Sequence, residues 1–406
     1  MQDHQSSDGD DDHVLGSALV RLHRIANVLP PASVVNIVEV VAGIVGARAG
    51  RLYVADYGLR SVRELGPDGP VGVPLTIEGT IQGRVFAEGA TISTGTDPTV
   101  LRVPLTDGTE RIGILELDFD DLDGVPVVLP AVVLVLVPVL LAKSRYSDAW
   151  VRCRRAQSLS AAAEVQWDLL PPLAAAAENI AVAGILKPAY SIGGDSFDYA
   201  LNHASLYFAI VDAVGHGMSA VMLAAAAINE IRNVRRASQP FETSYGRVDR
   251  LLIEHFGDSQ YVTGQIGSLD NRSGVLRWLN AGHPLPMLVR NGSYAGTLPC
   301  RPSMPMGLGG PIVEIAEQPL QRGDRVLFFT DGITESKSAT GEIFGEARLA
   351  DYLVRATLER LPVSETLRRL SAHVLSFVGD SLKDDATMFL IEHQVDPPCA
   401  ATLIDR

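Results

Sequence analysis

Residues 211–218 read VDAVGHGM, and this stretch joins an apolar run at residues 204–211 to an Ala-rich run at residues 218–237. The first run has the β-branched content of a buried strand, and the second has apolar residues at helical spacing. Asp212 therefore stands where a buried strand ends. A buried carboxylate is destabilising unless a positive charge accompanies it, and hard divalent cations prefer oxygen ligands of this kind.

Three other aspartates stand beside strand-like runs in the same way: Asp195 in GGD, Asp331 in TDG and Asp384 in DDAT. Two divalent ions held by such carboxylates lower the pKa of a shared water and steady the oxygens of an in-line displacement. Phosphoryl transfer needs mainly positioning and charge neutralisation, which carboxylates and glycines supply. The four stretches predict a metal-dependent hydrolase acting on phosphate. For each aspartate the alternative is a turn or a helix cap, and Asp385 is the rival of Asp384.

Composition limits the class of protein. The chain has 406 residues, 47% of them hydrophobic, which is enough for two or three separately packed domains. With 34 Lys and Arg against 48 Asp and Glu, the net charge of −14 argues against nonspecific nucleic-acid binding. A phosphorylated substrate would be repelled as well, so a bound metal is expected to reverse the local field. The three cysteines are too few and too far apart for a disulfide framework, which favours a reducing, cytoplasmic setting.

The chain is expected to contain two domains joined by a linker. Its start is acidic and lacks the basic and apolar sections of a secretion signal. The expected segments are a disordered acidic tail at residues 1–13, an α/β sensor domain at 14–143, a helical linker at 144–175, a catalytic domain at 176–393 and a C-terminal tail at 394–406.

Residues 125–142 are almost purely apolar, which is about the minimum length for spanning a bilayer. Three prolines within the segment and its many β-branched residues argue against a membrane helix. The interpretation favoured here is a buried final helix of the first domain, and a membrane helix is the alternative.

The linker has one stripe of residues at three- and four-residue steps: Leu159, Ala163, Gln166 and Leu170. Such a stripe can pair with a partner helix in a homodimer, or it can pack against the core of the next domain. Both alternatives are open at this point.

The second half is rich in strands and predicts a layered α+β sandwich. Antiparallel strands separated by long helices account for its pattern. The expected strands lie at residues 180–187, 204–211, 261–270, 274–281, 325–329 and 386–392, and the expected helices at 218–237, 248–256, 346–356 and 362–377.

Five motifs in this half occur in a familiar order and spacing. They read SIGGDSFD at residues 191–198, VDAVGHGM at 211–218, NAGHPLP at 280–286, FFTDGITE at 328–335 and DDATM at 384–388. Together they resemble the bacterial PPM-type serine/threonine phosphatases of the SpoIIE/RsbU-like branch, over residues 160–393. The resemblance implies an α-β-β-α sandwich of two antiparallel sheets and a site for two divalent cations, Mn²⁺ or Mg²⁺.

The resemblance also assigns roles to single residues. Asp212 matches the bridging metal ligand, and the carbonyl of Ala213 matches the backbone ligand beside it. Asp331 and Asp384 match the remaining carboxylates of the metal pair, and Asp195 matches the acid that holds metal-bound water. The residues that bind substrate are not identified.

Residues 14–143 resemble a GAF domain, most locally in GTIQGRVFAEG at residues 79–89. A small-molecule sensor and a domain that only packs or dimerises are both compatible with this pattern. We therefore expect a smaller α/β GAF-like domain ahead of the sandwich.

The resemblance implies a metal-dependent phosphatase that acts on phosphoserine or phosphothreonine of an anti-sigma factor antagonist, under control of the GAF-like domain. One alternative is a noncatalytic PPM-fold protein that only binds partners. A two-metal phosphodiesterase is disfavoured because His-Asp ligand clusters are missing. His216 and His283 could donate a proton to the leaving group, but structural roles in turns or caps are favoured for both.

Overall fold

The computed structural model describes residues 7–95, 99–120, 128–177, 179–190, 193–257, 259–379, 382 and 384–394. The described chain separates into two compact units, and the boundary along the chain lies between Gln157 and Ser158. Each unit has its own sheets and its own apolar core.

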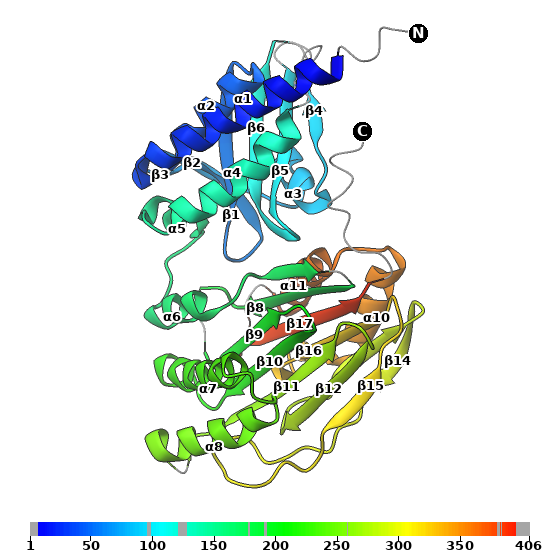
Figure 1. Cartoon of the computed structure of the whole chain (residues 1–406). Coiled ribbons are helices and arrows are strands. Elements are labelled where there is room, and N and C mark those ends of the chain that lie inside the picture. The colour runs from blue at the N-terminus through cyan, green and yellow to red at the C-terminus, as the bar shows by residue number, and fades with distance from the viewer. Residues whose placement is uncertain are drawn as a thin grey trace. The chain divides into compact units, whose positions relative to one another are not determined.

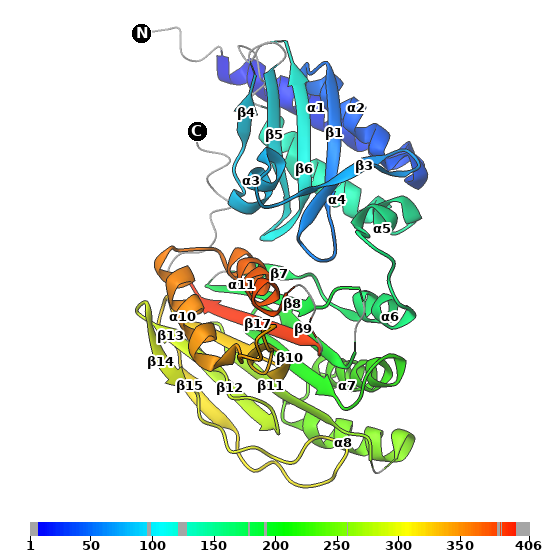
Figure 2. The same ribbon diagram turned by 180° about the vertical axis from the view of Figure 1, so that it is seen from behind.

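The first unit is built on one antiparallel sheet with the strand order β3-β2-β1-β6-β5-β4. Helices α1, α2 and α4 cover one face of this sheet and α3 covers the other (Figures 1 and 2). The elements are α1 (Ser7–Val28), η1 (Pro31–Asn36), α2 (Ile37–Val45), β1 (Ala49–Ala55), β2 (Ser61–Gly66), β3 (Gly69–Thr76), α3 (Ile81–Glu88), β4 (Ile92–Thr94), β5 (Thr99–Asp107), β6 (Glu110–Phe119), α4 (Leu129–Ser144) and α5 (Asp148–Arg154).

The acidic start of the chain differs from the expected tail at residues 1–13. Helix α1 begins at Ser7, so residues 7–13 are helical, and only residues 1–6 lie outside the described part.

The apolar segment at residues 125–142 contains a helix of the first core. Its described residues form most of α4, and Val132, Leu136 and Leu140 are buried against the sheet and α1. Within the described chain no single helix has both the length and the apolar character to cross a bilayer. Helices α4 and α5 meet that test only as a pair, across a bend of 103°. Residues 125–127 lie outside the described part.

Residues 144–175 do not form one continuous linker helix. Helix α5 packs on β2 and β3 of the first unit, whereas α6 (Ala161–Leu169) packs on the second unit. The predicted stripe lies on α6: Ala163 and Gln166 are buried, and Ala163 packs with Leu186 of the second unit. The described contacts of this stripe are therefore with the next domain, which is one of the two alternatives.

The second unit consists of two antiparallel sheets between two layers of helices (Figure 1). One sheet has the order β15-β12-β11-β10-β9 and the other β14-β13-β16-β17-β8-β7. The strands are β7 (Ala174–Ala177), β8 (Ile180–Lys187), β9 (Asp195–Leu201), β10 (Ser205–Ala213), β11 (Val262–Asp270), β12 (Val275–Ala281), β13 (Met287–Arg290), β14 (Ser293–Thr297), β15 (Ala316–Pro319), β16 (Arg325–Phe329) and β17 (Ala386–His393). The helices are α7 (Met218–Arg236), α8 (Thr243–Phe256), α9 (Asp331–Thr334), α10 (Gly345–Leu358) and α11 (Val363–Val378).

Aromatic side chains fill the space between the two sheets. Phe208 of β10 lies 4.6 Å from Phe328 of β16 and 6.0 Å from Phe389 of β17, measured between ring centroids. Helices α7 and α8 pack on the five-stranded sheet, and α10 and α11 pack on the six-stranded one. The predicted α-β-β-α sandwich of two antiparallel sheets is confirmed. The predicted C-terminal tail, beyond residue 394, lies outside the described residues.

A candidate metal centre between the two sheets

The predicted acidic residues lie at one end of the sandwich. Asp195 and Asp212 are directly opposite each other on β9 and β10 of the five-stranded sheet. Asp331 begins α9, just after β16, and Asp384 and Asp385 precede β17, which pairs with β16. Residues distant in sequence are therefore brought together from both sheets.

Burial and mutual repulsion act on these carboxyl groups. Burial raises the pKa of Asp212 to about 7, with further contributions from the negative charges of Asp331, Asp384 and Asp385. Burial also raises the pKa of Asp195, and Asp212 and Asp385 add to the shift. The pKa of Asp331 is raised by partial burial and then by Glu335 and Asp384. The five aspartates of the site thus influence one another.

Asp195 is the most deeply enclosed of the four predicted residues. Its side chain is buried, and its Oδ2 accepts a hydrogen bond of 2.7 Å from Oγ1 of Thr330. Its backbone carbonyl accepts a hydrogen bond from Nε2 of Gln166 on α6. Asp195 is therefore held by the six-stranded sheet and by the first helix of the unit.

The neighbours Asp384 and Asp385 differ in their contacts. Asp384 is exposed, and its Oδ1 accepts a hydrogen bond of 2.9 Å from the backbone N–H of Asp385. Asp385 is buried, and its carboxylate accepts hydrogen bonds from the backbone N–H groups of Gly193, at 2.8 and 3.0 Å, and Asp195, at 3.3 Å. Burial raises the pKa of Asp385 to about 6, against the effect of these N–H groups. The exposed carboxylate is thus the one open to the site.

Ala213, whose carbonyl is a predicted ligand, lies next to the first motif. Its N–H donates a hydrogen bond of 3.1 Å to the carbonyl of Gly194. A Cβ on Gly194 would collide with the carbonyl oxygen of Ala213, and a Cβ on Gly332 would collide with the carbonyl of Asp385. Glycine is required at both positions because backbone approaches backbone there.

The two histidines lie in different surroundings. His216 is exposed in the turn before α7, and the N-cap residue of that helix is Gly217. His283 is buried, and burial lowers its pKa to about 3. Its Nδ1 lies 3.0 Å from Oγ1 of Thr263, and its backbone N–H donates to Oδ1 of Asn280 at 2.7 Å. His283 is therefore neutral at physiological pH and holds a turn, in keeping with the structural role favoured from sequence.

The donor set suits a hard divalent cation in its chemistry, because it offers carboxylate oxygens of raised pKa. Across the described residues, no Lys, Arg or His forms an ion pair with any of the five aspartates. Within the same residues, no three His, Cys, Asp or Glu side chains are grouped closely enough to hold a metal ion. The carboxylates thus lie in the same region, but no three of the described ones are close enough together to bind one ion.

Sequence reasoning missed three supporting residues of this site. Thr330 was visible as part of TDG, but its hydrogen bond to Asp195 joins residues far apart in the chain. Gln166 was noticed only as a member of a helical stripe. Thr263 belongs to none of the five sequence motifs, although its Oγ1 lies 3.4 Å from the carbonyl oxygen of Asp212.

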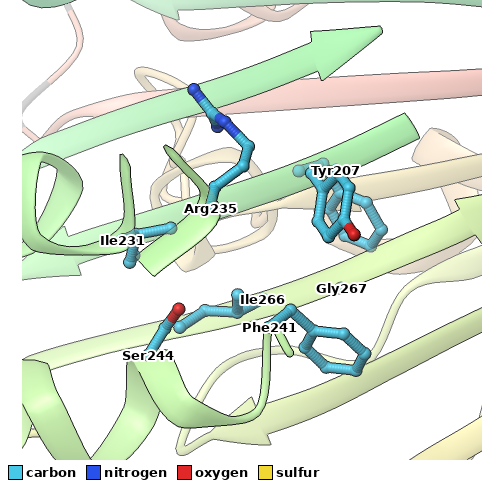
Figure 3. A pocket seen from close by; sticks show the side chains of 8 residues that line it. Tyr207, Ile231, Arg235, Phe241, Ser244, Ile266 and Gly267 are labelled. Atoms are coloured by element: carbon cyan, nitrogen blue, oxygen red, sulfur yellow. The ribbon is translucent and has the colours of Figure 1, made fainter. Parts of the chain in front are cut away.

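A cavity of about 10 Å³ lies between β10, β11 and helices α7 and α8, away from the aspartates (Figure 3). Its lining includes Tyr207, Ile231, Phe241 and Ile266. This volume holds about one water molecule, so the cavity is too small for a substrate.

Comparisons with known proteins agree with this geometry. Residues 202–394 match the family model of Stage II sporulation protein E (SpoIIE). Protein IcfG of Synechocystis is 23% identical over an alignment of 258 residues, and the match covers 56% of this chain and 40% of that protein. Phosphoserine phosphatase RsbU of Bacillus subtilis is 20% identical over an alignment of 243 residues, and the match covers 58% of this chain and 69% of that protein. The chain thus spans less than half the length of IcfG.

Solved structures show further similarities. The RsbU and RsbW domains of Rv1364c from Mycobacterium tuberculosis match with a TM-score of 0.46 and 25% identity, over 56% of this chain and 63% of that one. The PP2C domain of SiaA from Pseudomonas aeruginosa matches with a TM-score of 0.46 and 22% identity, over 52% of this chain and 85% of that one.

The sandwich with its acidic end and the matching family model define the class of the second unit: it is a PPM-type phosphatase domain. More narrowly, residues 202–394 are a domain of the SpoIIE family, so the resemblance to the SpoIIE/RsbU-like branch is confirmed for this part of the chain. The GAF-like identity of the first unit stays a prediction.

Proposed function

We propose that this chain is a metal-dependent phosphatase that removes phosphate from phosphoserine or phosphothreonine in a protein. Two divalent cations, Mn²⁺ or Mg²⁺, would be held by Asp212, the carbonyl of Ala213, Asp331 and Asp384, with Asp195 holding metal-bound water. When bound, the ions would supply an activated water and neutralise the charge of the phosphate. The curated relative RsbU is named a phosphoserine phosphatase, which supports the choice of substrate class.

The observation that carries this proposal is the convergence of acidic residues from two sheets, where no Lys, Arg or His of the described chain forms an ion pair with them. Asp212 of the five-stranded sheet is repelled by Asp331 and Asp384, which lie next to β16 and β17 of the six-stranded sheet. Such an arrangement destabilises the metal-free protein, because like charges are gathered in a partly desolvated place. A bound cation would remove this cost and would also attract a phosphate to a chain of net charge −14.

The test is phosphate release from a phosphoserine protein by the full chain, titrated with Mn²⁺ and with Mg²⁺. We expect activity that depends on the metal and is lost in Asp212→Asn. A chain that binds Mn²⁺ without releasing phosphate from any phosphoprotein, or that binds none, would instead favour the noncatalytic binding protein. Activity that persists in Asp212→Asn would contradict the proposed site.

The specific substrate that we propose is a phosphorylated anti-sigma factor antagonist. This choice rests on the resemblance to the SpoIIE/RsbU-like branch. It is tested by comparing release of phosphate from such an antagonist with release from an unrelated phosphoserine protein at the same concentration. A preference of less than about tenfold, or 1.4 kcal/mol, would argue against a dedicated substrate.

We also propose that the first unit, a GAF-like sensor, controls the phosphatase through α6. This helix directly follows the boundary between the units, and its Gln166 donates a hydrogen bond to the carbonyl of Asp195. The carbonyl of Leu169, at the end of α6, accepts a hydrogen bond from Arg232 of α7, which also pairs with Asp198 of β9. A shift of α6 would therefore be transmitted to β9, which begins at Asp195.

Control through α6 predicts that a flexible Gly-Ser insertion between Gln157 and Ser158 uncouples the two units. The insertion leaves Gln166 and its contact in place, so activity at saturating Mn²⁺ should persist while the response to the sensor's stimulus disappears. An insertion variant that responds as the original chain does would contradict this model.

A further inference from the structure

Asp385 is buried at the metal centre but has no part in the proposed mechanism. Its oxygens are already engaged: Oδ1 accepts from the N–H of Gly193, and Oδ2 accepts from the N–H groups of Gly193 and Asp195. Asp384, its neighbour, is exposed and makes no such hydrogen bond to residues 193–198, the described part of the first motif. The carboxylate of Asp385 is therefore engaged by the backbone, whereas that of Asp384 is exposed.

The contacts of Asp385 join the two sheets. Gly193 and Asp195 lead into β9 of the five-stranded sheet, whereas Asp385 leads into β17 of the six-stranded sheet. On its other side, the carbonyl of Asp385 lies so close to Gly332 that a Cβ there would collide with it. Asp385 thus contacts the backbone next to Asp195 and the backbone next to Asp331.

We propose that Asp385 is a positioning residue that sets the spacing between the two halves of the metal centre. Its carboxylate fixes the backbone of the GGD motif, and its carbonyl packs closely against Gly332 in the first turn of α9. Asp195 and Asp331, which come from different sheets, are thereby held at the separation that a metal pair requires. This inference rests on the proposed function, because it assumes that metal ions bind between the sheets.

The contact favours a carboxylate over an amide. Both oxygens of Asp385 accept hydrogen bonds, and its two partners are backbone N–H donors. An asparagine has the same shape but presents one oxygen and one NH₂ group, which would face these donors with another donor. Asp385→Asn should therefore weaken the hydrogen bonds to the GGD motif while keeping the volume of the side chain.

The experiment is Mn²⁺ binding to the full chain by calorimetry, together with phosphatase kinetics over a Mn²⁺ titration. We expect Asp385→Asn to weaken Mn²⁺ binding by about 10- to 100-fold, as is typical when the partner of a ligand is lost. The kcat at saturating Mn²⁺ should return to within a few-fold of the original value. Asp384→Asn, which removes a ligand, should keep a low kcat at every Mn²⁺ concentration.

The matched control is Asp249→Asn. Asp249 on α8 also accepts hydrogen bonds from two glycine N–H groups, those of Gly307 at 2.7 Å and Gly309 at 2.9 Å. This control should leave Mn²⁺ affinity unchanged even where it lowers the melting temperature. Equal losses of Mn²⁺ affinity in Asp249→Asn and Asp385→Asn would show a general structural effect and would overturn the inference.

A double-mutant cycle tests the contact itself. A Cβ added at Gly193 would stand 2.7 Å from Oδ2 of Asp385, so Gly193→Ala should weaken Mn²⁺ binding. In an Asp385→Ala background the colliding atoms are gone, and Gly193→Ala should then have little further effect. Independent losses that simply add would contradict the proposed contact.

Two other outcomes separate this inference from the proposed function. If the original chain binds Mn²⁺ and Asp385→Asn binds it equally well, only the positioning role is wrong. If Asp385→Asn loses kcat in the way that Asp384→Asn does, Asp385 is itself a ligand and the inference is again wrong. If the original chain binds no Mn²⁺ or Mg²⁺, the proposed function and this inference fall together.

Discussion

In the first unit the buried carboxylate of Glu116 lies between two guanidinium groups, whereas the aspartates of the candidate metal centre in the second unit repel one another. Glu116 pairs with Arg51 at 3.0 Å and with Arg102 at 2.5 Å, and it accepts a hydrogen bond of 3.0 Å from Gln82. Elsewhere in the second unit the buried Asp198 pairs with Arg232 and Arg235, but within the described chain no Lys, Arg or His forms an ion pair with the five aspartates of the candidate metal centre.

The difference separates two uses of a buried acid. The Glu116 cluster is neutralised by the chain itself and needs nothing from solution, so its role is structural within the sheet of the first unit. The aspartate cluster is left with uncompensated charge, and functional sites are places where such perturbed groups accumulate. Local net charge therefore distinguishes the two clusters better than the number of acidic residues does.

The largest expected effect that tests this comparison is loss of catalysis in Asp212→Asn. Phosphate release from a phosphoserine protein should fall by about 1,000-fold, similar to the loss of one group that stabilises charge in a transition state. The assay is run at saturating Mn²⁺, with Asp249→Asn as the control for general damage. A decrease of less than tenfold would mean that Asp212 does not hold the reacting centre.

The next effect is on stability and has opposite signs in the two clusters. Glu116→Gln leaves Arg102 and Arg51 without their shared partner, so the first unit should lose about 3 kcal/mol of unfolding free energy. Asp212→Asn removes repulsion, so the metal-free second unit should be as stable as before or more stable.

Hydrogen exchange in urea, followed on peptides of each unit, measures these two changes separately, because a chain of two units need not unfold in one step. Destabilisation of the metal-free second unit by Asp212→Asn would show that this carboxylate is compensated within the protein, and the contrast with Glu116 would fail.

Metal ions should stabilise one unit only. Mn²⁺ at about 100 times its Kd should add about 2.7 kcal/mol to the unfolding free energy of the second unit, because it binds the folded form. The first unit, whose Glu116 is already paired, serves as the internal control. Equal stabilisation of both units, or of neither, would remove the distinction between the clusters.

The aspartates could be found from sequence because each stands beside an apolar run, within a short motif. β8 was predicted with its observed bounds, since its residues before Lys187 form an unbroken run without polar side chains. β9 was not predicted as a strand: Asp195, Ser196 and Asp198 are buried polar residues, so its sequence lacks the apolar alternation of a strand.

The partners of the aspartates could not be found in the same way. The bonds from Thr330 to Asp195 and from Gly193 to Asp385 join residues that are more than 100 positions apart. The choice between Asp384 and Asp385 as the open carboxylate also depends on which one the fold buries. Such choices are set by tertiary packing, which a local motif does not contain. The division of residues 144–175 between two units has the same origin.

The smallest expected effect concerns His283, a buried group beside the site that is neutral rather than acidic. Its pKa is lowered to about 3 in the folded chain, whereas an unfolded histidine has a pKa of about 6.5. Between these values the unfolded state binds the extra proton, so the stability that His283 contributes is present above pH 6.5 and is lost as the pH falls.

From pH 7 to pH 5 this single group should lower the unfolding free energy of the second unit by about 2 kcal/mol. In His283→Gln that part of the pH dependence should disappear, while the contributions of the aspartates, common to both proteins, cancel in the difference. The measurement is urea unfolding of both proteins at pH 5 and pH 7 with EDTA present. Parallel pH dependences would mean that His283 is accessible to protons in the folded state, and it would then become a candidate acid for the leaving group.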